Sequence, residues 1–505
     1  MSIALDGHSL TLDALVAIAD ERDTITLDDA ARARVVAARR VVDEFAHHAS
    51  PTYGINTGFG DFAEVRIPED SLGELQLNLL RSHSAGVGDP LPVAAVRAMM
   101  ALRANVLAKG FSGIRVETLT LLIELINRGV HPVVPSRGSV GASGDLAPLA
   151  HLALVIVGEG EAWHEGTREA GAAALARVGL RPIALAPKEG LALINGTQAS
   201  TALLALALHG AERLARACDI VAALSIDGLQ GSTRPFDARI HAARPFEGQI
   251  ASAANLRALL DGSGINAAHA NCGRVQDAYS MRCAPQVHGA ARSAFRFAHQ
   301  VFDIEANAAT DNPMVFAEAA DIVSGGNFHG APVASAADLL CIGLTQLATI
   351  SERRADRLVN PASSGLPAFL TRHGGLQSGL MMAQVTAAAL ASELKTLAHP
   401  ASVDTIPTSG NREDHVSMSM AAALKASRAL DLARHVVAVE LLCACQAIDL
   451  LEPLRTSAPL ARVHELVRAH VPTLDHDRPP SPDIHVISRL IARGDLERAT
   501  ALNVN

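Results

Sequence analysis

The chain has 505 residues and a formal net charge of −9, which argues against a nucleic-acid-binding or anionic-membrane surface rich in Lys and Arg. Hydrophobic residues make up 49% of the sequence but aromatic residues only 3%, so the core must be aliphatic. Long runs dominated by Ala and Leu favour close-packed helices over a β-sandwich, and we expect a mainly all-α protein.

The cysteines and the N-terminal residues predict a reducing compartment. No C-x-x-C spacing occurs, so neither a zinc site nor a disulfide framework is expected among Cys218, Cys272, Cys283, Cys341, Cys443 and Cys445. The first residues carry no basic segment followed by an apolar core, and no apolar run reaches the roughly 18 residues of a membrane span. We expect a cytoplasmic protein that acts on a small molecule, with no metal, membrane or nucleic-acid partner.

The N-terminal quarter predicts helices separated by a glycine-rich loop. Two short amphipathic helices are expected between residues 9 and 49, with Thr11 and Thr26 as caps. The segment 53–60, YGINTGFG, then predicts a mobile loop that exposes Tyr53, one of only two tyrosines. That tyrosine is either a packing side chain or a catalytic one.

Three further helices are predicted over residues 75–84, 94–109 and 116–127. The first ends at His83, just before a glycine break. A neutral imidazole there either caps the helix or contacts a substrate, since histidine can donate or accept near pH 7.

The stretch 138–151, GSVGASGDLAPLAH, predicts a loop that turns into a helix. Between Gly141 and Asp145 the only side chains are a methyl and a hydroxymethyl, so this backbone is open to close approach. Asp145 is expected to cap the helix that follows. The G-x-S-x-G elbow of serine hydrolases is not met, because its fifth position is Asp145, and Ser143 is therefore not expected to be a hydrolase nucleophile.

Two polar clusters follow the glycine stretch. Asn195 heads a long Pro-free helix predicted to reach about Gly228, where it either caps the helix or presents its amide to a ligand. On a helical path, Gln276, Tyr279 and Arg282 fall on one face. Arg282 suits a two-pronged grip on a carboxylate, and Tyr279 beside a cation could move a proton; the alternative is a solvated polar face.

Long Pro-free helices are predicted over residues 333–358, 383–398 and 417–451, which indicates a helical bundle. Glu413 lies in a polar loop before the last of them and could act as acid, base or counter-ion. We expect an N-terminal region, 1–196, and a central bundle with C-terminal helices, 197–505, in one intertwined unit.

Taken together, five motifs resemble the aromatic amino acid ammonia-lyase family over nearly the whole chain. They are YGINTGFG at 53–60, GASGDLAPL at 141–149, NGT at 195–197, YSMRC at 279–283 and GNFH at 326–329. The resemblance implies the long-helix fold shared with aspartase and fumarase. It also implies a homotetramer in which each site is assembled from several subunits.

In that family an Ala-Ser-Gly triplet cyclises and loses water to form 4-methylideneimidazol-5-one (MIO), an electrophile made from the chain itself. The resemblance assigns this group to Ala142, Ser143 and Gly144. The remaining roles implied by the resemblance are proton handling by Tyr53 and Tyr279, carboxylate binding by Arg282, positioning of MIO and substrate by Asn195 and Gln276, and lining of the pocket by Phe328.

Two substrate classes remain open. Ser82-His83 and Glu413-Asp414-His415 resemble the histidine-acting branch, in which His83 and a glutamate contact the imidazole. Gly330-Ala331, Gly410 and Arg412 depart from that branch, and Ser-His also occurs in tyrosine lyases and aminomutases. We place elimination of ammonia from L-histidine to give urocanate first, and a tyrosine or aryl amino acid lyase or 2,3-aminomutase second.

Two other classes of protein are weighed against these. A non-enzymatic helical scaffold predicts that Ser143 stays a serine, which intact mass would reveal. A metal-dependent hydrolase is disfavoured, because no histidines are spaced i, i+4 with a nearby acid.

Overall fold

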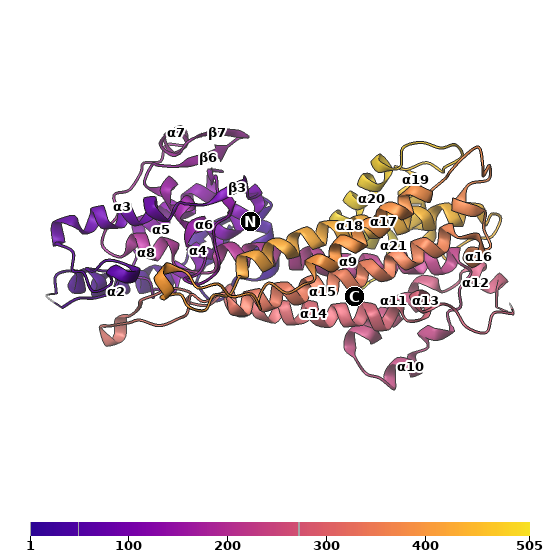
Figure 1. Ribbon diagram of the computed structural model, residues 1–505, viewed down its shortest axis with the longest axis horizontal. Coiled ribbons are helices and arrows are strands. Elements are labelled where there is room, and N and C mark those ends of the chain that lie inside the picture. The colour runs from indigo at the N-terminus through magenta and orange to yellow at the C-terminus, as the bar shows by residue number, and fades with distance from the viewer. Residues whose placement is uncertain (1, 49, 271–272, 505) are drawn as a thin grey trace. The chain divides into compact units, whose positions relative to one another are not determined.

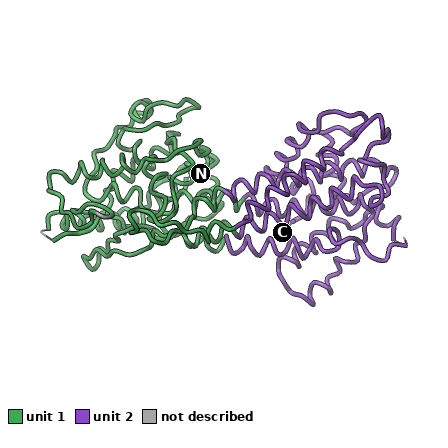
Figure 2. The backbone as a smooth tube through the Cα atoms, viewed as in Figure 1, with its two compact units in different colours: residues 1–209, 299–338, 400–424 green, residues 210–298, 339–399, 425–505 purple. Residues whose placement is uncertain are grey.

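The computed structural model describes residues 2–48, 50–270 and 273–504 and is mainly helical, with a few short strands (Figure 1). The prediction of a mainly α-helical protein is confirmed. The chain forms two compact units, each assembled from three segments (Figure 2). Unit 1 comprises 1–209, 299–338 and 400–424, and unit 2 comprises 210–298, 339–399 and 425–505. The predicted division after residue 196 stays a prediction.

Unit 1 combines medium-length helices with four small sheets. Its helices are α1 (Leu12–Ala19), α2 (Asp29–Ala46), α3 (Leu72–His83), α4 (Val93–Ala108), α5 (Val116–Asn127), α6 (Leu146–Ile156), α7 (Gly171–Arg177) and α8 (Glu189–Ile194). Its strands are β1 (Ser2–Leu5), β2 (Thr24–Leu27), β3 (Val87–Pro90), β4 (His131–Pro132), β5 (Pro135–Arg137), β6 (Glu161–His164), β7 (Thr167–Ala170), β8 (Met314–Phe316) and β9 (Asp321–Val323).

The small sheets are local pairings at the edges of helices. β1 pairs with β2 in parallel, whereas the pairs β3–β5, β4–β6, β6–β7 and β8–β9 are antiparallel. β2 lies within residues 9–49, where only two short helices were predicted, and β1 precedes that region. The segment around residues 159–167 contributes β6 and the start of β7.

The helix starts follow local hydrogen bonding. Thr11 caps α1 as predicted, and its side chain accepts from the backbone N–H of Ala14. The prediction that Thr26 caps the next helix is wrong: Thr26 lies in β2, and Asp28 caps α2 by accepting from the N–H of Ala31. Both residue types satisfy a free N–H at a helix start, so the choice between them depends on where the strand ends.

Unit 2 is built on long helices. Four of these contribute residues to both units: α9 (Gln198–Gly228), α14 (Ala284–Glu305), α15 (Ala331–Val359) and α18 (Ser419–Leu450). The helices wholly within unit 2 are α10 (Ala238–Ala242), α11 (Glu247–Leu260), α12 (Gly264–Ala268), α13 (Tyr279–Arg282), α16 (Pro361–Ser364), α17 (Met381–Leu397), α19 (Ala458–Arg468), α20 (Ser481–Arg493) and α21 (Asp495–Thr500).

Within unit 2 the long helices run side by side as a bundle (Figure 1). Their facing surfaces carry small and aliphatic side chains that are fully buried. Buried polar pairs connect them: the Arg354 guanidinium of α15 binds the Glu440 carboxylate of α18, which also accepts from Ser225 of α9 at 2.6 Å. A buried charge of this kind is tolerated because its partners replace the lost water.

One helix among the described residues is long and apolar enough to cross a membrane. It is α15, and 72% of its most apolar window is buried inside the protein. The expectation that no segment reaches this length and apolarity is therefore wrong for α15. Its burial among other helices is typical of a core helix.

Candidate active site

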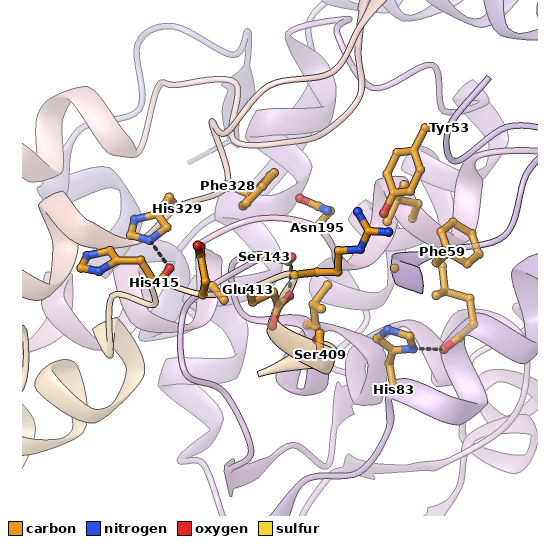
Figure 3. A pocket seen from close by; sticks show the side chains of 17 residues that line it. Tyr53, Phe59, His83, Ser143, Asn195, Phe328, His329, Ser409, Glu413 and His415 are labelled. Atoms are coloured by element: carbon orange, nitrogen blue, oxygen red, sulfur yellow. Dashed lines mark hydrogen bonds between the residues drawn. The ribbon is translucent and has the colours of Figure 1, made fainter. Parts of the chain in front are cut away.

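A cavity of about 350 Å³ opens within unit 1 (Figure 3). Its wall contains seven of the residues predicted for the site, which come from distant parts of the sequence: Tyr53, His83, Ala142, Ser143, Asn195, Phe328 and Glu413. Figure 3 shows Ser143 and Glu413 meeting in the middle, with His83 and Asn195 on different sides of them. Folding thus gathers most of the predicted polar groups around Ser143.

The loop that carries Ser143 is bent at two glycines. Gly141 has φ +68° and Gly144 has φ +72°, backbone conformations that residues other than glycine rarely adopt. A Cβ on Gly144 would lie 2.2 Å from the carbonyl oxygen of Gly196, with which the loop forms a bridge. The backbone of Gly144 therefore touches another backbone directly, as the composition of this stretch predicts.

We expect Gly144→Ala to lower the melting temperature by several degrees, because the Gly196 backbone cannot yield as a flexible side chain would. Gly166 is a matched control: it also has positive φ, but an added Cβ would meet nothing within 4 Å. Gly166→Ala should incur only the conformational cost, about 1 kcal/mol. Equal melting temperatures for the two variants would contradict the proposed close packing.

Asp145 lies at the N-cap of α6, as predicted, but its side chain does not cap that helix. Its carboxylate instead accepts from the N–H and hydroxyl of Ser200 in the first turn of α9, each at 2.8 Å, and from Ser139 at 2.9 Å. Burial raises the pKa of Asp145, and these hydrogen bonds oppose that rise. Asp145 thus ties the loop to α9.

The other end of the loop is held by the segments before α15 and α18. The carbonyl of Gly141 accepts from the Ser417 hydroxyl at 2.8 Å and from the Gly330 N–H at 3.3 Å. The Met418 N–H donates to the carbonyl of Val140 at 2.7 Å. With both ends fixed, the backbone between Gly141 and Asp145 has little freedom to relax.

Ser143 projects from this loop toward an acid. Its hydroxyl donates to Oε1 of Glu413 at 2.7 Å, and the Thr408 hydroxyl donates to Oε2 of Glu413 at 2.5 Å. The backbone of Thr408 also donates to the Glu413 carbonyl at 3.0 Å. The carboxylate is therefore oriented by Thr408 with one oxygen on Ser143.

Two titratable side chains on the wall are kept neutral by burial. Burial is the main cause that lowers the pKa of His83, and its ring Nδ1 lies 2.9 Å from the carbonyl of Leu79. Because a carbonyl can only accept, Nδ1 carries the proton and Nε2 is left as an acceptor. Burial also raises the pKa of Tyr53, so its phenol stays protonated at neutral pH.

Asn195 lies at the C-terminal end of α8, in extended backbone. Its carbonyl accepts from the buried guanidinium of Arg103 at 2.9 Å, and Arg103 also binds the carbonyls of Ala192 and Thr310. The Asn195 Oδ1 atom is buried and has no hydrogen-bond partner among the described residues. A fixed backbone with an unsatisfied amide oxygen at a cavity wall indicates a ligand-binding position.

Four predicted site residues do not line this cavity: Gly144, which lies in the loop of Ser143, and three residues of unit 2. Gln276, Tyr279 and Arg282 belong to unit 2, where they border two other hollows. The Arg282 guanidinium lies over the Tyr279 ring at 4.7 Å, and Tyr279 is 70% exposed. The prediction of a common helical face is wrong for Gln276, since α13 begins only at Tyr279.

Some wall residues were not predicted for the site. Leu79, Leu146 and Leu191 provide apolar surface, and Arg412 and Asp414 add charge beside Glu413. The three leucines carried no chemical signal of their own in the sequence, and Arg412 and Asp414 served there only to compare the chain with the histidine-acting branch. Their position depends on three-dimensional packing.

A stacked histidine pair also borders the cavity. The rings of His329 and His415 lie 5.9 Å apart at an angle of 12°, and Nε2 of His329 lies 3.2 Å from the His415 carbonyl (Figure 3). This contact joins the loop of Phe328 to the loop of Glu413.

Metal ligation finds no support in the described part of the chain. No group of three or more His, Cys, Asp or Glu side chains there could hold a metal ion. Cys218, Cys283, Cys341, Cys443 and Cys445 are free thiols, and Cys272 lies outside the described residues.

A long-helix fold with a cavity built around a glycine-bounded Ala-Ser-Gly loop defines a class of enzyme, the carbon–nitrogen lyases that act on aromatic amino acids. The model of the family described as aromatic amino acid lyase matches residues 10–469. The chain belongs to this family, and the resemblance predicted from the motifs is confirmed.

Individual relatives are similar over nearly their full length. Histidine ammonia-lyase of Stigmatella aurantiaca is 54% identical, over 98% of this chain and 97% of that protein. The crystal structure of histidine ammonia-lyase from Trypanosoma cruzi matches with a TM-score of 0.92 and 46% identity, covering 99% and 95% of the two chains. Tyrosine aminomutase from Streptomyces globisporus matches with a TM-score of 0.95 and 39% identity, covering both chains completely.

The Ala142-Ser143-Gly144 loop fits the MIO group expected from the family resemblance. The absence of a Cβ at Gly144 leaves its backbone free to approach other backbone atoms, and the Ser143 hydroxyl points into the cavity at Glu413. The unsatisfied Oδ1 of Asn195 lies on the same wall. These features supply the residues and the space for the group, and the amide of Asn195 adds an NH2 that can donate to it.

Proposed function

We propose that this protein eliminates ammonia from L-histidine to give urocanate, using an MIO group made from Ala142, Ser143 and Gly144. The observation that carries the proposal is the presence of a neutral His83 and the Glu413 carboxylate in the cavity that contains Ser143. The 54% identity to a histidine ammonia-lyase supports the same substrate.

His83 and Glu413 offer complementary contacts to an imidazole. Nε2 of His83 is an acceptor, because its Nδ1 proton faces the Leu79 carbonyl. It can therefore accept a hydrogen bond from the N–H of a substrate imidazole. A carboxylate such as Glu413 stabilises any positive charge on that ring.

This arrangement predicts how substrate affinity depends on pH. The pKa of His83 is lowered from 6.5 by burial, so its ring is neutral at pH 7 and becomes a cation only below that value. Once charged, Nε2 carries a proton and can no longer accept, and we expect kcat/KM for histidine to fall as the pH decreases through the pKa of His83. His83→Leu should raise KM by roughly 10-fold or more.

The substrate imidazole titrates near pH 6.5 as well and also contributes to the fall of kcat/KM at low pH. Comparison with His83→Leu isolates the part of that fall that is due to His83. A variant whose KM and acid limb equal those of the native enzyme would show that His83 does not contact the substrate.

The chemistry requires an electrophile, because ammonia is a poor leaving group and ordinary side chains provide none. MIO supplies an electrophilic methylene that activates the substrate for loss of its amine. The amide NH2 of Asn195 is suited to donating a hydrogen bond to the group, and its free Oδ1 to accepting one from the substrate amine. Phe328 contributes apolar surface against which a planar ring packs.

Proton transfer falls to the side chains that border the cavity. The Tyr53 phenol remains protonated because burial raises its pKa, so it is suited to giving a proton to the departing amine. The Glu413 carboxylate is suited to accepting one. Tyr279 is the third candidate, and it lies in unit 2.

We propose that Gln276, Tyr279 and Arg282 complete the site of another copy in a homotetramer with shared active sites. Tyr279 is largely exposed, and the buried Nε of Arg282 has no partner among the described residues. Arg282 then binds the substrate carboxylate, and Gln276 positions the substrate. A guanidinium binds a carboxylate through charge-assisted hydrogen bonds, and a side-chain amide hydrogen-bonds to polar groups. Binding of substrate would therefore satisfy the hydrogen-bonding groups of Arg282 and Gln276.

The composition supports a cytoplasmic location. The chain is acidic, with a net charge of −9, and the thiols of Cys218 and Cys443 are buried and unpaired. Free thiols of this kind are usual in a reducing compartment. A small amino acid is the proposed partner, with neither nucleic acid nor membrane involved.

A substrate screen tests the proposal. The protein is incubated with L-histidine, L-tyrosine and L-phenylalanine, and the ultraviolet spectrum of the conjugated acid is recorded together with ammonia release. We expect urocanate from histidine. The 39% identity to a tyrosine aminomutase favours a second candidate, which would give a β-amino acid or a coumarate from tyrosine. Absence of urocanate at every histidine concentration would overturn the first.

A further inference from the structure

We propose that Glu413 also catalyses the dehydration of Ser143 during maturation, before it meets any substrate. This inference rests on the proposed function, since it concerns how the MIO group forms. The observation behind it is the 2.7 Å hydrogen bond from the Ser143 hydroxyl to Oε1 of Glu413. Oγ of Ser143 is the atom that must leave as water.

The hydrogen bond has no place in the mature enzyme. Maturation removes Oγ of Ser143, so the contact with Glu413 exists only in the unprocessed chain. Thr408 holds Oε2 of Glu413 at 2.5 Å, which leaves Oε1 directed at Ser143. A carboxyl group held in this orientation is well placed to protonate Oγ of Ser143 as it leaves.

Two waters are lost in sequence. In the first step the amide nitrogen of Gly144 forms a bond to the carbonyl carbon of Ala142. The carbonyl oxygen leaves as water with the two amide protons of Ser143 and Gly144, and a C=N bond forms between Ala142 and Ser143. The new ring acidifies the Cα–H of Ser143, since the resulting anion is shared with the C=N and C=O bonds.

Glu413 acts in the second step. Its carboxylate takes the Cα proton of Ser143, and the electron pair left behind forms the Cα=Cβ bond. The Cβ–Oγ bond breaks, and Glu413 returns the proton to the departing oxygen, which leaves as water. The carboxylate is regenerated, so no further reagent is needed.

Neighbouring acids are less suited to this role. The Asp145 carboxylate is occupied by Ser200 and Ser139. Asp414 follows Glu413 on the same loop and lines the same cavity, but only Glu413 among the described residues bonds to the Ser143 hydroxyl in this structure. Asp414 therefore provides a matched control.

The test is the intact mass of the full-length chain, followed over time after synthesis. The native chain should lose two waters. Glu413→Gln keeps the size of the side chain but cannot take up a proton, and it should lose the second water about 100-fold more slowly or not at all. The one-water form should accumulate, and fragmentation should place the retained hydroxyl on Ser143. Asp414→Asn should lose both waters at the native rate.

Loss of both waters from Glu413→Gln at the native rate would overturn the inference and leave the proposed function standing. A native chain that loses no water would overturn the proposed function itself. Equal slowing in Asp414→Asn and Glu413→Gln would also overturn the inference, because the effect would then belong to the loop as a whole.

Two milder variants decide the matter if Glu413→Gln does not fold, as judged by circular dichroism. Thr408→Val keeps the carboxylate but removes the hydrogen bond that orients it, and Glu413→Asp keeps the acid on a shorter side chain. Both should lose the second water more slowly than the native chain. Native rates in both would overturn the inference.

Discussion

Replacing Ser143 with alanine is expected to lower the rate of ammonia release from L-histidine by roughly 10³-fold or more. Alanine has no hydroxyl to lose, so the methylene that makes the loop electrophilic cannot form. The remaining groups, such as His83 and Asn195, still bind the substrate, and KM should change far less than kcat. Steady-state kinetics with urocanate absorbance as the signal measure both.

The helical fold should survive the substitution. Among the described residues the Ser143 side chain hydrogen-bonds only to Glu413, and the loop is held by backbone contacts and by Asp145. Ser409→Ala is a suitable control, because Ser409 lines the same cavity without belonging to the triplet. Its activity should stay within a few-fold of native. Activity of Ser143→Ala within 10-fold of native would exclude MIO as the electrophile.

Helix positions were predictable wherever apolar periodicity was uninterrupted. The helix predicted over residues 116–127 is observed as Val116–Asn127, and that predicted over 333–358 as Ala331–Val359. The start of α2 was not predictable, because a strand ending at Leu27 moves the cap to Asp28. Thr26 and Asp28 have similar capping chemistry, and only the pairing of β2 with β1 decides between them.

The glycine-bounded loop was also readable from its sequence, because Gly144 is required by a close backbone approach. The partner in that approach, Gly196, could not be identified from the sequence. The same holds for Asp145, which lies at the expected cap position but bonds to Ser200 in α9. Contacts of this range depend on how helices pack, and local pattern does not encode them.

The site itself was predicted in part. Residues with distinctive chemistry, such as Tyr53 and Glu413, could be named from the sequence and line the same cavity. The stacked pair of His329 and His415 was not anticipated, since two histidines from separate loops show no spacing pattern. The assumption of one helical face for Gln276 failed because α13 begins only at Tyr279, after Ala278 in extended backbone.

Mixing two inactive variants is expected to restore activity if each site is shared between copies of the chain. Tyr53 lies in unit 1 and borders the cavity, whereas Tyr279 lies in unit 2 and does not. Tyr53→Phe and Tyr279→Phe each remove one phenol from every site, and each alone should lower kcat roughly 100-fold or more. Phenylalanine keeps the ring, so packing is preserved.

When the two variants are co-expressed in equal amounts, random assembly gives a native Tyr53 and a native Tyr279 to about one site in four. Roughly a quarter of native activity should then return, carried by assemblies whose mixed composition intact-mass measurement confirms. If both tyrosines of a site came from one chain, every site would lack one phenol and no activity would return. Co-expression of Tyr53→Phe with Ser143→Ala is the matched control: both residues line the unit 1 cavity, so this mixture should remain inactive.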